Sequence, residues 1–470
     1  MVSLRHYHIR IIHVKVFRGF CFLNRQFHVI VMHEVLKMKI GFVSLGCSKN
    51  LVDSEKIMGM LKDGNHEMVS DPAQAEAIII NTCGFINPAK EEAISTIFKM
   101  AEYKKYNCKK LIVVGCLAQR YKDVLMKDIP EIDAVISIRE YPHIHEILGQ
   151  LLDGHDLVSY AKAERLVSSK PWTAYLKIAE GCSNHCTYCA IPLIRGDNVT
   201  FPMEQIIEEA NQLAKRGVKE LVLIAQDTTK YGVDLYGKRS LLPLLQKLHE
   251  IDGFHWIRIL YMYPDEIDEE LIEGMAKLPK VLPYFDIPMQ HANNRMLASM
   301  NRRGTKEDVL KLIKKIRETF ANPTLRTTFI VGFPGETNEE FEELKQFVKD
   351  VHWDRMGSFT YSPEEDTPAF DMDGAIDEAI KNQRLDELMQ LQQAISLENQ
   401  QKMVGKTLEV LVEDQDGLRG IYRGRSVHDA PDEVDGVVLF TSDRVIDFGE
   451  FVQVKITEAM THDLKGVEVC

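Results

Sequence analysis

The sequence predicts an α/β protein in three parts: an N-terminal parallel α/β domain, a central partial TIM-like (β/α)6 barrel and a small all-β barrel at the C-terminus. Three observations support this prediction. Apolar strands and amphipathic helices alternate over 39–152, and the alternation restarts at Trp172 with longer strand–helix units. Short strands of alternating apolar and polar residues follow Gly405. With 470 residues, the chain is also too long for one compact core.

The N-terminal domain is predicted from four short apolar strands, namely KIGFVSL, AIIINTC, LIVVGC and DAVIS. Helical patterns separate them, which favours a small parallel sheet. Three of the four strand ends carry a cysteine: Cys47, Cys83 and Cys116. Because ligands gather at the carboxyl ends of parallel strands, we expect these three thiols to converge and act together as ligands.

The central domain is predicted from six strands separated by helical patterns such as 204–217 and 306–320. The strands are expected at 172–180, 219–227, 254–263, 281–290, 325–332 and 354–361. Six strand–helix units in one direction favour a partial barrel whose chemistry lies at the strand C-termini. A long polar helix over roughly 375–403 follows. The short strands KTLEVLVE, GIYRGRS, GVVLF and FVQVKIT then predict the small all-β barrel.

The first 37 residues differ from the rest. They hold six Lys or Arg, five His and one acid. An organelle transit peptide is also Arg-rich and acid-poor, but Ser is scarce here. We interpret 1–37 as a non-native or disordered extension, with the working chain beginning near Met38.

Composition limits the function further. Hydrophobic residues make up 45% and charged residues 27%, and no apolar run reaches the roughly 18 residues of a membrane span. The net charge of −13 argues against direct binding to nucleic acid. Nine cysteines without a signal peptide predict a reducing, cytoplasmic location, where a tight cysteine cluster indicates metal or redox chemistry.

The strongest motif is EGCSNHCTYCAIPLIRG, which places Cys182, Cys186 and Cys189 directly after the first barrel strand. Three close thiolates can bind three irons of a 4Fe–4S cluster and leave the fourth iron open to a small ligand. The alternative is a structural zinc site. Zinc needs a fourth ligand, and the close candidate His185 lies inside the spacing itself, so we favour the cluster.

This spacing resembles that of the radical-SAM superfamily. The resemblance implies that the open iron holds S-adenosylmethionine, whose reductive cleavage releases a 5′-deoxyadenosyl radical. It also implies cofactor contacts at positions near the barrel mouth. These candidates are Tyr188, beside the adenine, and the strand-end residues Gln226, Asp227, Gln290 and Arg326. Capping and loop hydrogen bonds are the alternative for such polar groups. Arg195 is a candidate for binding a substrate carboxylate, because a guanidinium pairs with one bidentately.

Both cysteine sets together resemble the methylthiotransferase family, over essentially all of 38–470. That family inserts CH3–S at an unactivated C–H bond. The resemblance implies two 4Fe–4S clusters, with S-adenosylmethionine serving as both radical source and methyl donor. It divides the chain into an N-terminal methylthiotransferase domain at 38–153, a radical-SAM core at 168–400 and a TRAM-like β-barrel at 402–470.

Finer motifs select a branch of this family. VSLGCSKNLVDSE, NTCGFINPAKEEAI and LIAQDTTKYGVDLYG look like the branch that modifies an aspartate of a small-subunit ribosomal protein of uS12 type, at its β-carbon. The transfer-RNA adenosine branch resembles GCQMN and GQNVNxY at the corresponding places, where this chain has GCSKN and AQDTTKY. The resemblance also implies a reducing partner such as flavodoxin or ferredoxin.

The charge of the C-terminal barrel bears on the partner. Residues 404–470 hold seven basic and fourteen acidic residues, a net charge of −7. Such a domain repels RNA but suits a basic ribosomal protein, although a solvated acidic surface without a partner is the alternative. Two other functions stay open: a transfer-RNA adenosine methylthiotransferase, and a non-catalytic iron–sulfur carrier or metal-binding RNA module. A carrier would use four cysteines for each cluster.

Overall fold

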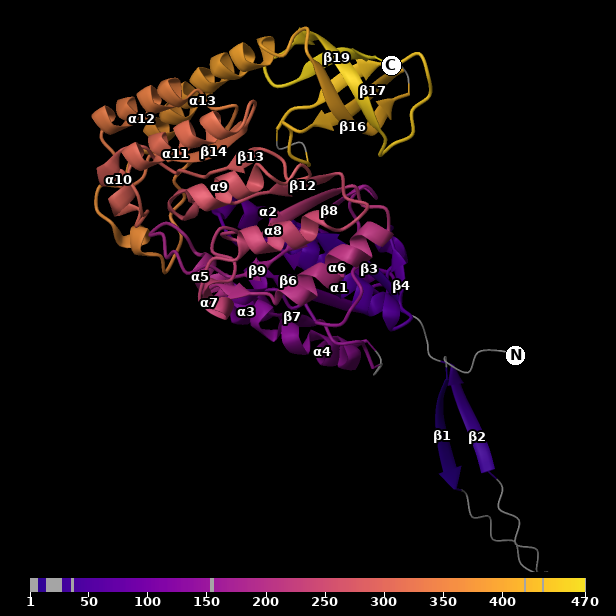
Figure 1. Cartoon of the computed structure of the whole chain (residues 1–470). Coiled ribbons are helices and arrows are strands. Elements are labelled where there is room, and N and C mark those ends of the chain that lie inside the picture. Colours follow the sequence, from indigo (N-terminus) through magenta and orange to yellow (C-terminus); the bar gives the residue numbers. More distant parts are fainter. Residues whose placement is uncertain are drawn as a thin grey trace, which may run out of the picture.

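The computed structural model describes residues 7–13, 28–34, 38–152, 156–417, 420–432 and 435–469. The N-terminal and central domains pack into one body, and the C-terminal barrel lies at the far end of a long helix (Figure 1). The extension predicted at 1–37 lies largely outside the described residues. Within it, β1 (Tyr7–His13) pairs with β2 (His28–Glu34) in antiparallel register.

The N-terminal domain is a parallel sheet in the order β4-β3-β5-β6-β7, flanked by helices. Its strands are β3 (Lys39–Ser44), β4 (Glu67–Val69), β5 (Ala77–Thr82), β6 (Lys110–Gly115) and β7 (Ala134–Ile136). Its helices are α1 (Ser48–Asp63), α2 (Asn87–Ala101), α3 (Cys116–Asp128) and α4 (Ile144–Leu151). The predicted parallel sheet is confirmed. The sequence prediction missed the edge strand β4, whose three residues EMV include a glutamate and form no apolar run, unlike AVI of β7.

The central domain holds the predicted strands in sequential parallel order. They are β8 (Thr173–Lys177), β11 (Glu220–Ile224), β12 (Trp256–Ile259), β13 (Tyr284–Asp286), β14 (Thr324–Val331) and β15 (Arg355–Thr360). A parallel bridge between Ile257 and Val281 joins the two three-stranded halves, so the partial TIM-like barrel is confirmed. Most strands are shorter than predicted, because the chain turns away at the mouth; β12, for instance, ends two residues before Tyr261, which has φ +61°.

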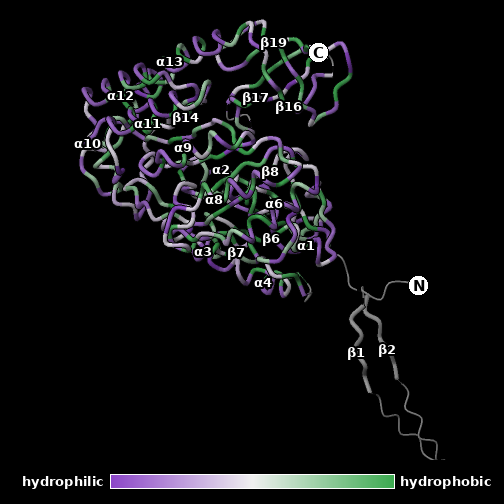
Figure 2. Tube along the Cα trace, in the orientation of Figure 1, coloured by the Kyte–Doolittle hydropathy of each residue, from purple (hydrophilic) through white to green (hydrophobic). Residues whose placement is uncertain are grey.

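Helices cover the outside of this barrel. They are α5 (Ile191–Arg195), α6 (Met203–Lys215), α7 (Val233–Tyr236), α8 (Leu241–His249), α9 (Glu269–Met275), α10 (Asn294–Ser299), α11 (Lys306–Thr319), α12 (Asn338–Val351) and α13 (Glu378–Gln401). Short elements complete the two domains: β9 (Ala179–Glu180), β10 (Val199–Thr200), and 3-10 turns at Pro72–Gln74, Glu102–Lys105, Ile138–His143, Pro264–Glu266 and Pro368–Asp371. Figure 2 shows the hydrophobic stretches mainly inside the body, whereas α12 and α13 at its edge are largely hydrophilic. Among the described residues, no helix is long and apolar enough to cross a membrane.

The C-terminal strands close into a barrel in the order β16-β17-β18-β20-β19, which confirms the predicted small all-β barrel. They are β16 (Thr407–Asp416), β17 (Ile421–Ser426), β18 (Val438–Thr441), β19 (Phe451–Ala459) and β20 (Leu464–Glu468). This barrel docks on the N-terminal ends of the central strands. Arg425 donates to Glu220 at the start of β11 and to Glu413 of β16.

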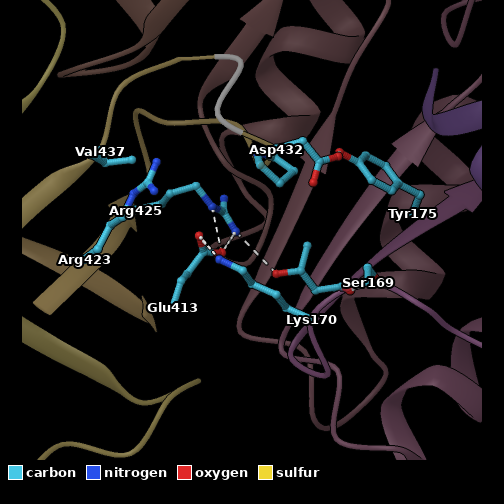
Figure 3. Close-up of a pocket in the computed structure, with 10 residues that line it drawn as sticks. Ser169, Lys170, Tyr175, Glu413, Arg423, Arg425, Asp432 and Val437 are labelled. Atoms are coloured by element: carbon cyan, nitrogen blue, oxygen red, sulfur yellow. Dashed lines mark hydrogen bonds and ion pairs between the residues drawn. The ribbon is translucent and has the colours of Figure 1, made fainter. Parts of the chain in front are cut away.

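A cavity of about 270 Å³ lies in this junction (Figure 3). Its charged side chains contact one another: Lys170 and Arg425 both pair with Glu413, and Tyr175 donates to Asp432. We therefore assign this cavity to domain packing. Two more acids of the C-terminal barrel enter the floor of the central barrel, where Asp429 pairs with Arg355 and Asp435 accepts from Tyr284. The C-terminal barrel thus closes the end of the central barrel that is opposite to its mouth.

Candidate cluster and cofactor cavity

The first cysteine set lies at the carboxyl edge of the N-terminal sheet, as the sequence predicts. Cys47 caps the N-terminus of α1, Cys83 follows β5, and Cys116 begins α3. Asn50, which is fully buried, ties the three strand ends together. Its side-chain amide donates to the carbonyls of Leu45 and Thr82, each at 3.1 Å, and its side-chain oxygen accepts from Cys116 Sγ at 3.4 Å. Helix N-termini favour negative charge, which favours a thiolate at Cys47 and opposes the effect of burial at Cys116.

Two glycines allow this convergence. Gly115 has φ +96°, and a Cβ on it would lie 2.2 Å from the side-chain oxygen of Asn81. Gly46 has φ +88°, and a Cβ there would lie 2.8 Å from the Cβ of Cys83. A side chain at either position would push the strand ends apart, so each glycine directly precedes a cysteine that it helps to place.

The second cysteine set lies in a loop at the mouth of the central barrel. Gly181 (φ +74°) packs against the carbonyls of Gly196 and Asp197, which closes the base of the loop. Cys182 donates its backbone N–H to the Gly196 carbonyl, and Cys189 donates to the carbonyl of Cys186, each at 3.0 Å. The loop is therefore shaped before any ligand binds.

Both cysteine sets line the same cavity, which has a volume of about 330 Å³ and lies between the N-terminal domain and the barrel mouth. Within the described part of the chain, no three His, Cys, Asp or Glu side chains are placed to hold a single metal ion. His185, the proposed fourth zinc ligand, is exposed and lies 3.3 Å from Asp197. A multi-iron cluster with wider ligand spacing fits this donor set better than zinc does.

The thiols differ in their electrostatic surroundings. Burial raises the pKa of Cys116 to about 12 and that of Cys182 to about 11. Cys47 is accessible to solvent inside the cavity, but the protein around it opposes its ionisation. The positive charges of Lys49 and Arg195 outweigh this effect and lower the pKa of Cys47. Because iron ligands are thiolates, cluster binding must displace protons from the buried thiols.

Arg195 lies in this cavity, but its guanidinium is already paired. It donates to Asp53 at 3.1 Å, to Glu180 at 2.6 Å and to the Asn50 side chain, and it lies 3.6 Å from Cys116 Sγ. The sequence analysis predicted that Arg195 binds a substrate carboxylate. In the structure it pairs with two carboxylates of the protein itself and links the second cysteine loop to the first cysteine set, and its substrate role stays a prediction.

The predicted cofactor residues divide into two groups. Tyr188, Gln226, Gln290 and Arg326 all line the cavity, as predicted for cofactor contacts. Asp227 does not line it: its carboxylate accepts from Asn184 of the cysteine loop at 2.7 Å and from the backbone of Thr229. These hydrogen bonds hold the cysteine loop, and a contact between Asp227 and the cofactor stays a prediction.

Sequence reasoning missed several cavity residues, including Lys49, Tyr261 and Arg302. Arg302 stacks on the Tyr263 ring with 4.0 Å to its centroid and lies 3.9 Å from Cys186 Sγ. It comes from a loop with no strand-end pattern, so nothing in the sequence indicates its position. Lys49 stands two residues after Cys47 in the GCSKN motif, which is the one sequence feature that could have identified it.

Comparisons with known proteins agree with this arrangement. Residues 39–137 match the uncharacterized protein family UPF0004, 176–348 match the radical SAM superfamily, and 404–469 match the TRAM domain. Among solved structures, the radical S-adenosylmethionine methyltransferase TsrM from Kitasatospora setae, with cobalamin and a [4Fe-4S] cluster bound, aligns with a TM-score of 0.54. It is 11% identical and covers 81% of this chain and 78% of its own, so this likeness concerns the fold alone.

Curated relatives are much closer in sequence. The ribosomal protein uS12 methylthiotransferase RimO of Clostridioides difficile (strain 630) is 51% identical over 91% of this chain and 98% of its own length. The protein of the same name from Caldicellulosiruptor saccharolyticus is 48% identical over 91% of this chain and 99% of its own.

Proposed function

Because the chain belongs to the family of ribosomal protein uS12 methylthiotransferases, we propose that it transfers a methylthio group to the β-carbon of an aspartate in that small-subunit ribosomal protein. It is a radical-SAM methylthiotransferase, and its cofactors are S-adenosylmethionine and two 4Fe–4S clusters. One observation carries the proposal most directly: the two cysteine triplets, far apart in sequence, line one cavity. A reaction that joins radical chemistry to sulfur transfer needs both sites within reach of one substrate atom.

We assign the first cluster to Cys47, Cys83 and Cys116 and the second to Cys182, Cys186 and Cys189. Each set supplies three thiolates, and no other cysteine of the described residues adds a thiolate for the fourth iron of either cluster. Cys108 does not complete either set, because it is buried elsewhere and contacts the carbonyl of Lys110. A plain electron carrier would use four cysteines for each cluster, which disfavours the carrier hypothesis.

We assign the remaining cavity residues to binding and orienting S-adenosylmethionine and the substrate. When bound, S-adenosylmethionine and the two clusters supply the hydrogen abstraction, the methyl group and the sulfur. Tyr188, next to Cys189 in the chain, offers a ring to an adenine. Gln226 and Gln290 offer polar groups beyond the strand ends, and Arg326 offers one from the first half of β14. Arg326 is held in place by Asp286, whose carboxylate lies 2.8 Å from Arg326 Nη1.

A buried ion pair network joins the domains around this cavity. Asp53 of α1 accepts from both Lys177 of β8 and Arg195 of α5, and Glu180 pairs with the same two cations. Removing one member of such a network leaves an unpaired buried charge. The network therefore fixes the distance between the two cysteine sets.

The proposal extends to partners and location. A basic ribosomal protein suits the acidic C-terminal barrel, and a low-potential donor such as flavodoxin or ferredoxin would reduce the second cluster. A cytoplasmic location is part of the proposal, supported by a ribosomal protein as the proposed substrate. Direct nucleic-acid binding is not part of the proposal, given the net charge of −13.

The test is anaerobic reconstitution with iron and sulfide, followed by incubation with S-adenosylmethionine, a reductant and either purified uS12 or transfer RNA. Mass spectrometry of both substrates then locates the product. We expect methylthiolation of one uS12 aspartate at its β-carbon and unmodified transfer RNA. Methylthio-adenosine in the transfer RNA, with unmodified uS12, would establish the alternative branch instead.

A further inference from the structure

Four cationic side chains line the cavity among the described residues: Lys49, Arg195, Arg302 and Arg326. Two of them already contact carboxylates of the protein, Arg195 with Asp53 and Arg326 with Asp286. Arg302 donates to the Pro288 carbonyl and lies against Cys186, so it belongs to the second cysteine set. Lys49 remains.

Lys49 is a buried cation that extends from the N-terminal domain towards the barrel. Its residue is only 5% exposed, and its ammonium lies over the ring of Tyr261, with Nζ 3.1 Å from the ring centroid. In the part of the chain that the structure describes, no carboxylate or other hydrogen-bond acceptor contacts this ammonium. A buried charge is costly unless an opposite charge or an acceptor meets it. Among the described residues Lys49 acts on the Cys47 thiol, whose pKa it lowers, but it has no carboxylate partner, so its ammonium is matched to an anion that enters the cavity.

The ring under Lys49 is rigidly held. Tyr261 adopts φ +61°, a conformation uncommon for residues other than glycine. Its backbone N–H donates to Asp286 at 2.9 Å, and its carbonyl accepts from the backbone and the hydroxyl of Thr228. Strain that the surroundings enforce in this way is typical of functional sites. Here it fixes the platform on which the ammonium rests.

We propose that Lys49 binds the side-chain carboxylate of the target aspartate and thereby selects an acidic residue for modification. This inference rests on the proposed function. In an aspartate the carboxylate carbon is bonded directly to the β-carbon, so an anchor on the carboxylate also fixes the reacting atom. Lys49 is two residues from Cys47 and touches a barrel side chain, so its ammonium lies where the two cysteine sets face each other.

The test compares Lys49→Met, which keeps length but removes charge, with Lys49→Arg, which keeps charge. Lys62→Met is the matched control, because Lys62 is an exposed lysine in the last turn of the same helix α1. Each anaerobically reconstituted enzyme is assayed for iron content and for its Kd with purified uS12, and with a uS12 variant in which the target aspartate is asparagine.

We expect K49M to weaken binding of native uS12 by about tenfold or more, with iron content unchanged, while K62M binds like the wild type. K49R should recover part of the loss. On asparagine-bearing uS12, K49M and the wild type should bind within about twofold of each other, because the carboxylate is absent.

Three results would overturn the inference. The Kd of K49M for native uS12 could be unchanged, K49M could lose the same affinity for both uS12 forms, or K49M could lose iron while its affinity for uS12 stays unchanged. The last would make Lys49 a counter-charge for the first cluster only. The asparagine-bearing uS12 tests the carboxylate on the wild-type enzyme too, so the inference stays testable even if K49M folds poorly. If wild-type enzyme modifies uS12 at an aspartate and K49M binds normally, this inference alone fails; if the wild type leaves that aspartate unmodified, the proposed function fails.

Discussion

Replacing Glu220 with glutamine should release the C-terminal barrel from the central domain. Glu220 is fully buried at the start of β11, where its two carboxylate oxygens accept from Arg258 at 2.8 Å and from Arg425 of the C-terminal barrel. Both arginines are themselves almost fully buried. Glutamine is nearly the same size but neutral, and its amide hydrogens would face the arginine donors.

The size of the effect follows from the pKa of Glu220. Burial alone would raise this pKa, but Arg425 and Arg258 outweigh burial and lower it from 4.5 to about 2. A difference of that size corresponds to about 3 kcal/mol of stabilisation, which agrees with the roughly 3–5 kcal/mol lost when one partner of a buried ion pair is removed. Because the folded-state pKa lies below the unfolded one, this stabilisation is present above about pH 5 and is lost as the pH falls toward 2.

Tryptophan fluorescence during urea unfolding provides the assay. Trp172 contacts Phe448 and Trp256 contacts Phe451, so two tryptophans sit at the junction and report its opening. In this multi-domain chain the first transition reports undocking, and the variant should lower its free energy by about 3 kcal/mol. The matched control is Glu208→Gln, an exposed carboxylate on α6. A first transition within about 0.5 kcal/mol of the wild type in E220Q would refute the reasoning, since that is the range of ordinary surface changes.

Three further predictions concern the clusters and the domain contact. Reconstituted wild-type protein should bind about eight irons, and the variant with alanine at Cys182, Cys186 and Cys189 about half of that; unchanged iron in that variant would contradict two clusters. Alanine at Cys47, Cys83 and Cys116 should spare reductive cleavage of S-adenosylmethionine, measured as 5′-deoxyadenosine, but abolish the methylthio product; dependence of 5′-deoxyadenosine on this set would reverse the roles. Glu364 of the barrel mouth pairs with Lys90 at 2.6 Å and Arg120 at 2.9 Å in the N-terminal domain and is almost fully buried. Glu364→Gln should therefore speed hydrogen exchange in α3 and reduce methylthiolation more than cofactor cleavage, whereas equal losses of both would argue against a positioning role.

The sequence predicts most of the fold because each domain repeats one simple pattern. Parallel strands with connecting helices put all strand ends on one edge, which is why Cys47, Cys83 and Cys116 could be expected to converge. Strand lengths were less predictable. At the mouth, hydrogen bonds from distant loops rather than local preference determine where the chain leaves the sheet, as Thr228 and Asp286 do at Tyr261.

The roles of charged cavity residues could be predicted only in part. Whether an arginine is free for a substrate depends on which carboxylates pack beside it, and those come from remote segments: Arg195 meets Asp53 of α1, 142 residues earlier. The same holds for Asp227, whose partner Asn184 lies in another loop. Lys49 shows the converse case, in which packing leaves a cation without a carboxylate partner among the described residues.

The structure also changes the interpretation of the acidic charge of the C-terminal barrel, which the sequence analysis assigned to a basic partner. Of its acidic residues, Asp429, Asp432 and Asp435 contact the central barrel, and Glu413 pairs with Lys170 and Arg425. Part of the net charge of −7 therefore serves domain docking and does not face a partner. The exposed acids that remain, such as Asp443 and Asp447, lie on a domain attached to the floor of the central barrel, whereas the cysteine cavity lies at its mouth. Acidic charge there can speed the encounter with a basic protein. Placement of the reacting aspartate must come from the cavity itself, which is why the cavity-lining ammonium of Lys49 carries more weight for specificity than the net charge of the whole domain.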